Sequence, residues 1–257
     1  MSADIFLILA LVAAGLLIAA RFVLKTYAGA KYRSTSFGDV IVGNAQLIGE
    51  QDEQNDYFEI SHKNGVTLAV IADGATKRKI GKFAAVVAVN TLKANFTGGM
   101  YESLGPSEYF AHSFEAIEKT FSDNSVGNKV AATLVAVIVD NDVMHYACVG
   151  DGAIIIFRGG ELINVPDHSE IGKRTLRKSD AILLCSAGAR NSLTEMEILH
   201  ELSKRKTHPY EKCMNLSKHI REKMFKNQDN ASIIALEISK IRPKYEKSAP
   251  YPPLSVG

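Results

Sequence analysis

The chain has 257 residues, of which 46% are hydrophobic, and its formal net charge at neutral pH is +2. This length is enough to bury a substantial core, and the nearly balanced charge gives no overall field that would attract nucleic acid, so we expect no nucleic-acid partner. The three cysteines, Cys148, Cys185 and Cys213, lie far apart without metal-binding spacing, which predicts free thiols in a reducing compartment.

The amino end differs from the rest of the chain. Residues 5–20 carry no charge, and the apolar run resumes after Arg21, which gives about 20 apolar residues, enough to cross a bilayer. Basic residues follow this run, whereas one acidic residue and the terminal amine precede it, so the positive-inside rule puts the main domain in the cytoplasm. We predict a single-pass membrane anchor over residues 1–24 and a juxtamembrane linker over residues 25–37.

A cleaved signal peptide is the alternative for this segment. Residues 28–30, Ala-Gly-Ala, resemble a cleavage site. However, the region before the apolar run contains no Lys or Arg, which such peptides require.

The pattern of a folded domain begins at Gly38, and we predict that this domain extends to residue 239. The domain alternates clusters of strands with pairs of helices, which predicts an α+β fold: antiparallel β-sheets with helices stacked outside them. The tail, residues 240–257, contains Ala-Pro-Tyr-Pro-Pro without periodicity and is predicted to be disordered. The predicted strands are 40–48, 57–61, 67–74, 132–139, 143–149, 153–158, 161–165, 181–185 and 232–238, and the predicted helices are 79–95, 107–121 (with Ser107 as N-cap), 193–202 and 208–226.

The strand at 67–74 is the centre of any site that the sequence suggests. It reads T-L-A-V-I-A-D-G, an apolar run followed directly by Asp73 and Gly74. A carboxylate at the end of a buried strand costs free energy unless a cation or several donors meet it, and glycine lets the backbone approach a ligand closely. The alternative is an ordinary Asp-Gly turn that ends the strand.

Four acidic residues recur at the ends of predicted strands: Asp56, Asp73, Asp151 and Asp229. If the fold brings them to one edge of a sheet pair, they form the oxygen-rich environment that Mg²⁺ and Mn²⁺ prefer. Two such ions would polarise a phosphoryl oxygen and generate hydroxide from bound water. Four independent turns, each with its own acidic residue, remain the alternative.

A series of short motifs resembles one known family, the metal-dependent protein phosphatases (PPM, or type 2C serine/threonine phosphatases). Their order and spacing agree over about 200 residues, from Gly38 to Ile238. The series is specific although no single motif is decisive. The motifs are A-V-I-A-D-G (69–74), A-T-L-V-A-V (132–137), Y-A-C-V-G-D-G (146–152), F-R-G-G-E-L (157–162), D-H-S (167–169), L-L-C-S-A-G (183–188) and Q-D-N (228–230).

The resemblance implies a β-sandwich flanked by helices, in α-β-β-α order, with a centre for two Mg²⁺ or Mn²⁺ ions at one end. Carried over to this chain, Asp73 would bridge the two ions and the Gly74 carbonyl would ligate one of them. Asp229 would ligate the other ion, and Asp56 would orient metal-bound water.

Several positions depart from the family pattern. Gln51 stands where the family has an arginine that grips phosphate, Asn55 where it often has an acid, and Asn128 near an aspartate of bacterial members. Ala187 stands where the family has an aspartate that ligates metal. Loss of a carboxylate ligand costs several kcal/mol of cation affinity or reactivity, and a Gln gives one neutral hydrogen bond where Arg gives a charged fork. The segment 167–181 is also short, so the flap subdomain of the family is expected to be missing or reduced.

Two functions from different classes follow. The first is a membrane-tethered pseudophosphatase or weak enzyme that binds a phosphoprotein or a regulatory protein partner in signalling; the second is an active Mg²⁺/Mn²⁺-dependent serine/threonine phosphatase. An aspartyl-phosphate enzyme with Asp73 as nucleophile is a weaker third, because the acid it would need two residues later is Ala75. The basic run 77–79 either attracts phosphate or begins a solvated helix.

Overall fold

The computed structural model describes residues 36–74, 79–124, 131–165 and 170–241. The predicted anchor (1–24), most of the predicted linker, and residues 242–257 of the predicted tail lie outside the described residues. Among the helices of the described ranges, none has both the length and the apolar character needed to span a membrane.

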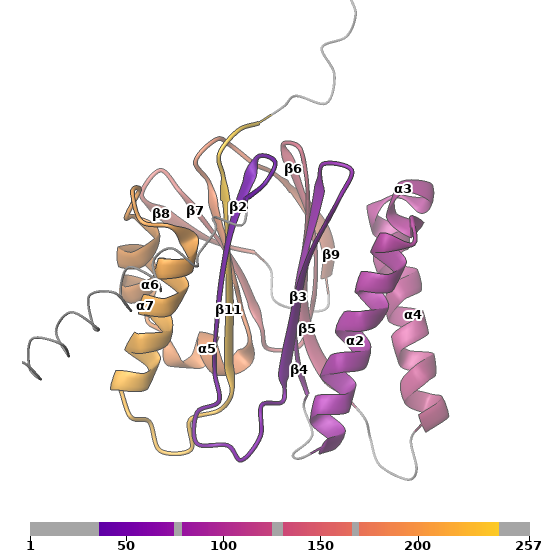
Figure 1. Cartoon of the computed structure of the whole chain (residues 1–257), viewed down its shortest axis with the longest axis horizontal. Coiled ribbons are helices and arrows are strands. Elements are labelled where there is room, and N and C mark those ends of the chain that lie inside the picture. Colours follow the sequence, from indigo (N-terminus) through magenta and orange to yellow (C-terminus); the bar gives the residue numbers. More distant parts are fainter. Residues whose placement is uncertain (1–35, 75–78, 125–130, 166–169, 242–257) are drawn as a thin grey trace, which may run out of the picture. The chain divides into compact units, whose positions relative to one another are not determined.

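Two antiparallel sheets form the centre of the described domain (Figure 1). Every pairing between neighbouring strands is antiparallel. The six-stranded sheet has the order β1 (Ser36–Phe37), β2 (Val40–Leu47), β11 (Ala231–Ile238), β10 (Ala181–Cys185), β7 (Ala153–Arg158) and β8 (Glu161–Val165), and the five-stranded sheet has the order β3 (Asp56–Lys63), β4 (Val66–Gly74), β5 (Ala132–Asp140), β6 (Val143–Val149) and β9 (Glu170–Thr175).

Strand β4 shows how the apolar runs of the sequence fill this architecture. Side chains alternate across a strand, so Ala69 and Ile71 belong to the core between the two sheets. Leu68, Val70 and Ala72 belong to a second core on the outer face of the same sheet. The strand is therefore buried on both faces, as its unbroken apolar sequence predicts.

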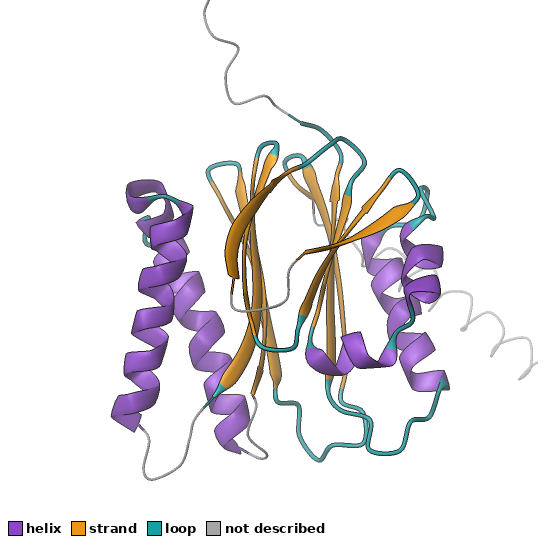
Figure 2. Cartoon of the chain, turned by 180° about the vertical axis from the view of Figure 1, so that it is seen from behind, coloured by secondary structure: helices purple, strands orange, loops and turns teal. Residues whose placement is uncertain are grey.

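Helices cover the outer face of each sheet, which gives the predicted α-β-β-α layers (Figures 1 and 2). The layers explain why the predicted α+β class holds: each sheet has two apolar faces, and both must be covered. The helices on the five-stranded sheet are α2 (Lys79–Thr97), α3 (Met100–Leu104) and α4 (Pro106–Asn124), and those on the six-stranded sheet are α5 (Ala187–Ser192), α6 (Glu195–Leu202) and α7 (Pro209–Glu222).

Helix boundaries differ from the predictions where local chemistry decides them. Helix α4 begins at Pro106, so Ser107 lies inside its first turn and the prediction that it is the N-cap is wrong. Proline suits the first helical position because its missing N–H would have no partner there. Helix α6 begins at Glu195, later than predicted, because Thr194 caps it and forms a capping box with Glu197.

Four short elements are absent from the sequence prediction: α3, α5, β1 and β9. Each is too short, or in β9 too polar, to give a periodic signal of its own. Strand β1 consists of two residues of the predicted linker, which pair with Val40 and Ile41 of β2. The three cysteines are buried free thiols, as their spacing predicts.

Candidate metal centre

The acidic residues of the sequence analysis meet at one end of the sandwich. Strand β3 begins at Asp56 and the antiparallel strand β4 ends at Asp73 and Gly74, and the two aspartates are direct cross-strand partners. Strand β5 begins at the same end, where Thr133 lies opposite Asp73. Turn chemistry alone would not bring Asp56 and Asp73 together; the register of the β3–β4 pair does so.

The other sheet brings its own strand ends to this position. Strand β11 begins directly after Asp229, and β10 ends just before Ser186. The backbone N–H of Ser186 donates to the carbonyl of Ser232 (3.0 Å), and the N–H of Ser232 donates to the Ser186 hydroxyl (3.0 Å). Asn230 bridges the sheets, because its Oδ1 accepts from the N–H of Asn55 at 2.7 Å.

The Asp56 carboxylate is buried at the start of β3. Its residue is 3% exposed, and neither carboxylate oxygen has a hydrogen-bond partner within the described part of the chain. Burial raises the pKa of Asp56 to about 6, and the nearby Asp229 adds to the rise, whereas the hydroxyls of Ser232 and Ser186 oppose it. A cation bound at this carboxylate would offset the free-energy cost of burying its charge.

Burial also raises the pKa of Asp73, and three other acids contribute to this rise. Burial is the main cause, and the charges of Asp56, Asp229 and Asp151 add to it, so the pKa rises to about 7. Asp56, Asp229 and Asp151 therefore all lie within electrostatic range of Asp73. Of the four acids, the strand register pairs Asp56 with Asp73, and Asp229 and Asp151 lie near enough to Asp73 to raise its pKa.

Two glycines allow the close packing at this end. A Cβ on Gly74 would overlap the backbone of Gly81, so the end of β4 lies directly against the first turn of α2. A Cβ on Gly188 would overlap the carbonyl of Asn230 and lie 3.2 Å from the Cβ of Asp229. Ala187, one residue before Gly188, is the first residue of α5. Its methyl group offers no oxygen at the position where the family resemblance implies a ligand.

The chemistry of these residues fits a hard divalent cation. Carboxylate and backbone carbonyl oxygens are the preferred ligands of Mg²⁺, and the unpartnered oxygens of Asp56 would gain a compensating charge. Across the described ranges, however, no group of three or more His, Cys, Asp or Glu side chains is arranged to hold an ion by itself. The residues therefore fit an ion that keeps several water ligands, as Mg²⁺ usually does.

The structure leaves some sequence predictions untested and adds residues that they missed. Asn128, the D-H-S motif at 167–169, and Lys77 and Arg78 of the basic run lie outside the described residues. Ser186, Ser232 and Asn230 were not predicted as parts of the site. A sequence signal for Ser232 exists, because it is a polar residue at the start of a mostly apolar strand, and in the structure it is fully buried.

Comparison with known proteins identifies the fold. A family model described as Protein phosphatase 2C matches residues 45–177, just over half of the chain. No curated protein matches. Among solved structures, the serine/threonine phosphatase of S. agalactiae is 20% identical, with a TM-score of 0.70 over 77% of this chain and 99% of that chain.

Two further solved structures share the fold. The serine/threonine phosphatase PstP of Mycobacterium tuberculosis is 14% identical, with a TM-score of 0.67 over 78% of this chain and 99% of its own, and the PstP catalytic domain has also been solved with two manganese ions at the same identity and TM-score. RsbX, solved with magnesium, is 15% identical, with a TM-score of 0.58 over 78% of this chain and 96% of that chain. The α-β-β-α layers, the paired acids at the sheet ends and the match to the family model lead to one conclusion: the chain belongs to the protein phosphatase 2C family.

Proposed function

We propose that this chain is a phosphatase-type domain with a reduced metal centre, which binds a phosphoprotein or a regulatory protein partner and hydrolyses phosphate esters weakly or not at all. The observation that carries the proposal is the methyl group of Ala187 at the start of α5, one residue before Gly188, which packs against Asn230 and Asp229. A cation bound here has one carboxylate fewer than the family resemblance implies. For a hard divalent ion, that loss weakens binding and leaves its charge less compensated.

The remaining ligands define where an ion would be held. Asp73 and the Gly74 carbonyl, at the end of β4, would hold one ion, and Asp229, before β11, would hold a second or share the first. Mg²⁺ and Mn²⁺ are the ions in question, supported by the two manganese ions of PstP and the magnesium of RsbX. A bound ion supplies Lewis acidity and lowers the pKa of bound water. Asp56 would orient that water from the neighbouring strand.

Recognition of phosphate is also expected to be weakened. Gln51 follows β2 in the loop that leads to Asp56, where the family resemblance implies an arginine. A neutral amide makes weaker hydrogen bonds to a phosphate dianion than a guanidinium fork does. Weaker recognition of phosphate is therefore expected to slow turnover of a phosphate ester.

Calorimetric titration of the purified chain with Mn²⁺, combined with hydrolysis of p-nitrophenyl phosphate, tests the proposal. We expect weak metal binding, in the millimolar range, and turnover close to that of Asp73→Asn. Micromolar binding with clear turnover that Asp73→Asn abolishes would show that the proposal is wrong. That outcome would establish the second candidate, an active Mg²⁺/Mn²⁺-dependent serine/threonine phosphatase.

The second candidate has its own support. Asp56, Asp73 and Asp229 lie together with raised pKa values at Asp56 and Asp73, which is the arrangement that a bound cation would relieve. Perturbed pKa values of this kind cluster at functional sites. A phosphopeptide library separates the two candidates, because an active enzyme releases inorganic phosphate whereas a binding module retains the peptide.

We also propose that residues 1–24 anchor the domain to a membrane as a single pass, with the domain on the cytoplasmic side. The support is the uncharged run at 5–20 and the basic residues that follow it. Alkaline carbonate extraction of membranes tests the anchor, since the full chain should stay in the pellet. A chain that begins at residue 25 should be released, and retention of both chains would contradict the proposal.

A further inference from the structure

A cavity of about 430 Å³ lies at the end of the six-stranded sheet opposite the acidic residues. Its lining residues come from the ends of β7 and β11 and from the start of β10. The acidic residues lie at the other end of the same strands, where β10 ends and β11 begins. β11 has eight residues, so the two sites are separated by roughly 20–25 Å. The cavity is therefore a separate place in the molecule, of the size that small-molecule sites have.

Two ion pairs build the polar wall of this cavity. Arg158, at the end of β7, donates from Nε (3.0 Å) and Nη2 (2.6 Å) to the Asp180 carboxylate, which is almost fully buried. Lys212, on α7, is 1% exposed and donates to Glu237 of β11 and to the carbonyl of Leu202 (3.1 Å). Each pair is neutral as a unit, so the wall itself adds no net charge.

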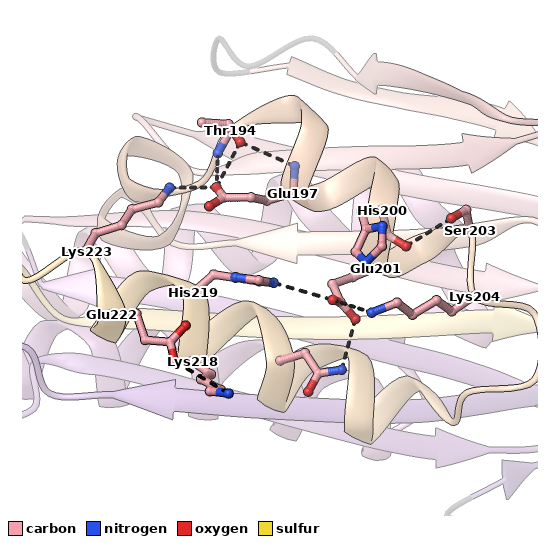
Figure 3. Close-up of polar contacts among 11 residues, drawn as sticks. Thr194, Glu197, His200, Glu201, Ser203, Lys204, Lys218, His219, Glu222 and Lys223 are labelled. Carbon is pink, nitrogen blue, oxygen red and sulfur yellow. Dashed lines mark hydrogen bonds and ion pairs between the residues drawn. The ribbon is translucent and has the colours of Figure 1, made fainter.

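The excess charge comes from two cations at the rim. Lys178, in the turn between β9 and β10, and Arg205, after α6, are both exposed and line the cavity. Neither forms an ion pair with any other described residue, whereas Lys204, next to Arg205, is paired with Glu201 (Figure 3). The lining therefore carries four cations against two carboxylates, a net formal charge of +2.

The cavity lining also includes apolar side chains and one residue with a strained backbone. Ile41, Phe157 and Leu202 give the cavity an apolar part beside its charged wall. Ser179, next to Lys178, has a φ of 71°, a left-handed conformation that a residue other than glycine rarely adopts. Backbone strain of this kind is often retained at ligand-binding positions. It holds Lys178 and Asp180 on either side of one tight turn.

We propose that this cavity binds a small phosphate monoester whose apolar group enters between Ile41, Phe157 and Leu202. The phosphate dianion lies between Lys178 and Arg205 at the rim. A dianion matches the net charge of the lining, and the guanidinium of Arg205 matches the geometry of phosphate oxygens. The proposal does not depend on metal binding at the acid cluster or on phosphatase activity.

Isothermal titration of the full chain with phenyl phosphate tests the proposal, in a mildly alkaline buffer with EDTA so that the acid cluster holds no divalent ion. The unmodified chain should bind phenyl phosphate, and Lys178→Gln/Arg205→Gln should weaken binding by at least about tenfold. Lys119→Gln/Arg221→Gln removes one exposed lysine and one exposed arginine elsewhere on the domain, and should bind like the unmodified chain.

A second variant tests the apolar part. Ile41→Trp fills part of the cavity, so it should lower the affinity for phenyl phosphate by about tenfold. The affinity for inorganic phosphate, which is weaker from the start, should stay unchanged. Thermal unfolding of each variant verifies that it is folded. The proposal is overturned if the unmodified chain gives no binding heat, if the two double variants bind alike, or if Ile41→Trp binds phenyl phosphate normally.

Discussion

Asp56 and Asp73 face each other as direct partners in the antiparallel β3–β4 ladder, so two carboxylates share one buried end of the sandwich. Like charges directly opposite each other destabilise a sheet. The arrangement therefore has a cost in the metal-free protein, and a cation bound between the strand ends would remove it. This tension between stability and ion binding leads to the first two predictions.

Asp73→Asn should stabilise the metal-free protein at neutral pH by about 2 kcal/mol, because it removes a buried charge whose pKa is raised to about 7. Between the ordinary pKa of 3.8 and about 7, the folded protein holds more protons than the unfolded chain, so the unfolding free energy of the unmodified protein falls as pH rises. In the variant, the unfolding free energy should fall less steeply as pH rises. Urea unfolding in EDTA at mildly acidic and neutral pH measures both effects.

The matched control for this prediction is Asp52→Asn, which removes an exposed carboxylate in the loop before Asp56. It should leave both the stability and its pH dependence nearly unchanged. If Asp73→Asn were as neutral as Asp52→Asn, the carboxylates at the strand ends would not be repelling each other.

Ala187→Asp should raise the affinity for Mn²⁺ by at least about tenfold, because it returns a carboxylate to a half-buried position one residue before Gly188, which packs against Asp229. The first turn of α5 contains no acidic residue, and an anion there is favoured by the helix dipole. Calorimetric titration with Mn²⁺ measures the gain. Ala187→Asn, which has the same shape without the charge, should gain little, and equal affinity in both variants would contradict the ligand assignment.

Glu197→Gln should lower the unfolding free energy by about 1 kcal/mol, since Glu197 joins two helices (Figure 3). Its carboxylate accepts from the N–H and hydroxyl of Thr194 and from Nζ of Lys223, which follows α7. Burial pushes the pKa of Glu197 up, but the bonds from Lys223 and Thr194 outweigh it and lower the pKa to about 2.

The sign of the pH effect follows from that lowered pKa. The stabilisation by Glu197 is fully present above its ordinary pKa of 4.5 and is lost as pH falls toward 2. Thermal unfolding of the unmodified chain and of Glu197→Gln should therefore differ near neutral pH and converge in acid. Glu195→Gln, an exposed change in the same helical turn, should behave like the unmodified chain at every pH.

Arg158→Met should destabilise the domain by about 3 kcal/mol, because it leaves the buried carboxylate of Asp180 without its cation. The backbone N–H of Arg177 also donates to Asp180 at 2.7 Å, but one neutral donor does not replace a bidentate guanidinium. Chemical denaturation measures the loss. Arg177→Met is the control, because it retains the backbone donor to Asp180 and removes only an exposed side chain. It should lower the unfolding free energy by less than about 0.5 kcal/mol.

Several strands could be predicted from the sequence because their signals are local. The predicted strands 153–158, 161–165 and 181–185 coincide with β7, β8 and β10, since each is an apolar or alternating run bounded by turn residues. The polar β9 could not be read in this way, because it is a strand only by virtue of its pairing with β6. Helix α5 has six residues and depends on packing against β10 and β11.

The sequence by itself determined that acidic residues stand at strand ends, that the chain resembles metal-dependent phosphatases, and that Ala187 replaces an expected ligand. Only the tertiary structure decided that the buried Asp56 carboxylate has no hydrogen-bond partner among the described residues, that Gly188 brings α5 against Asp229, and that a charged cavity forms at the far end of the sheet. The reason is physical: composition and periodicity are local properties of the chain. Burial, register and electrostatic coupling arise between segments that are far apart in sequence.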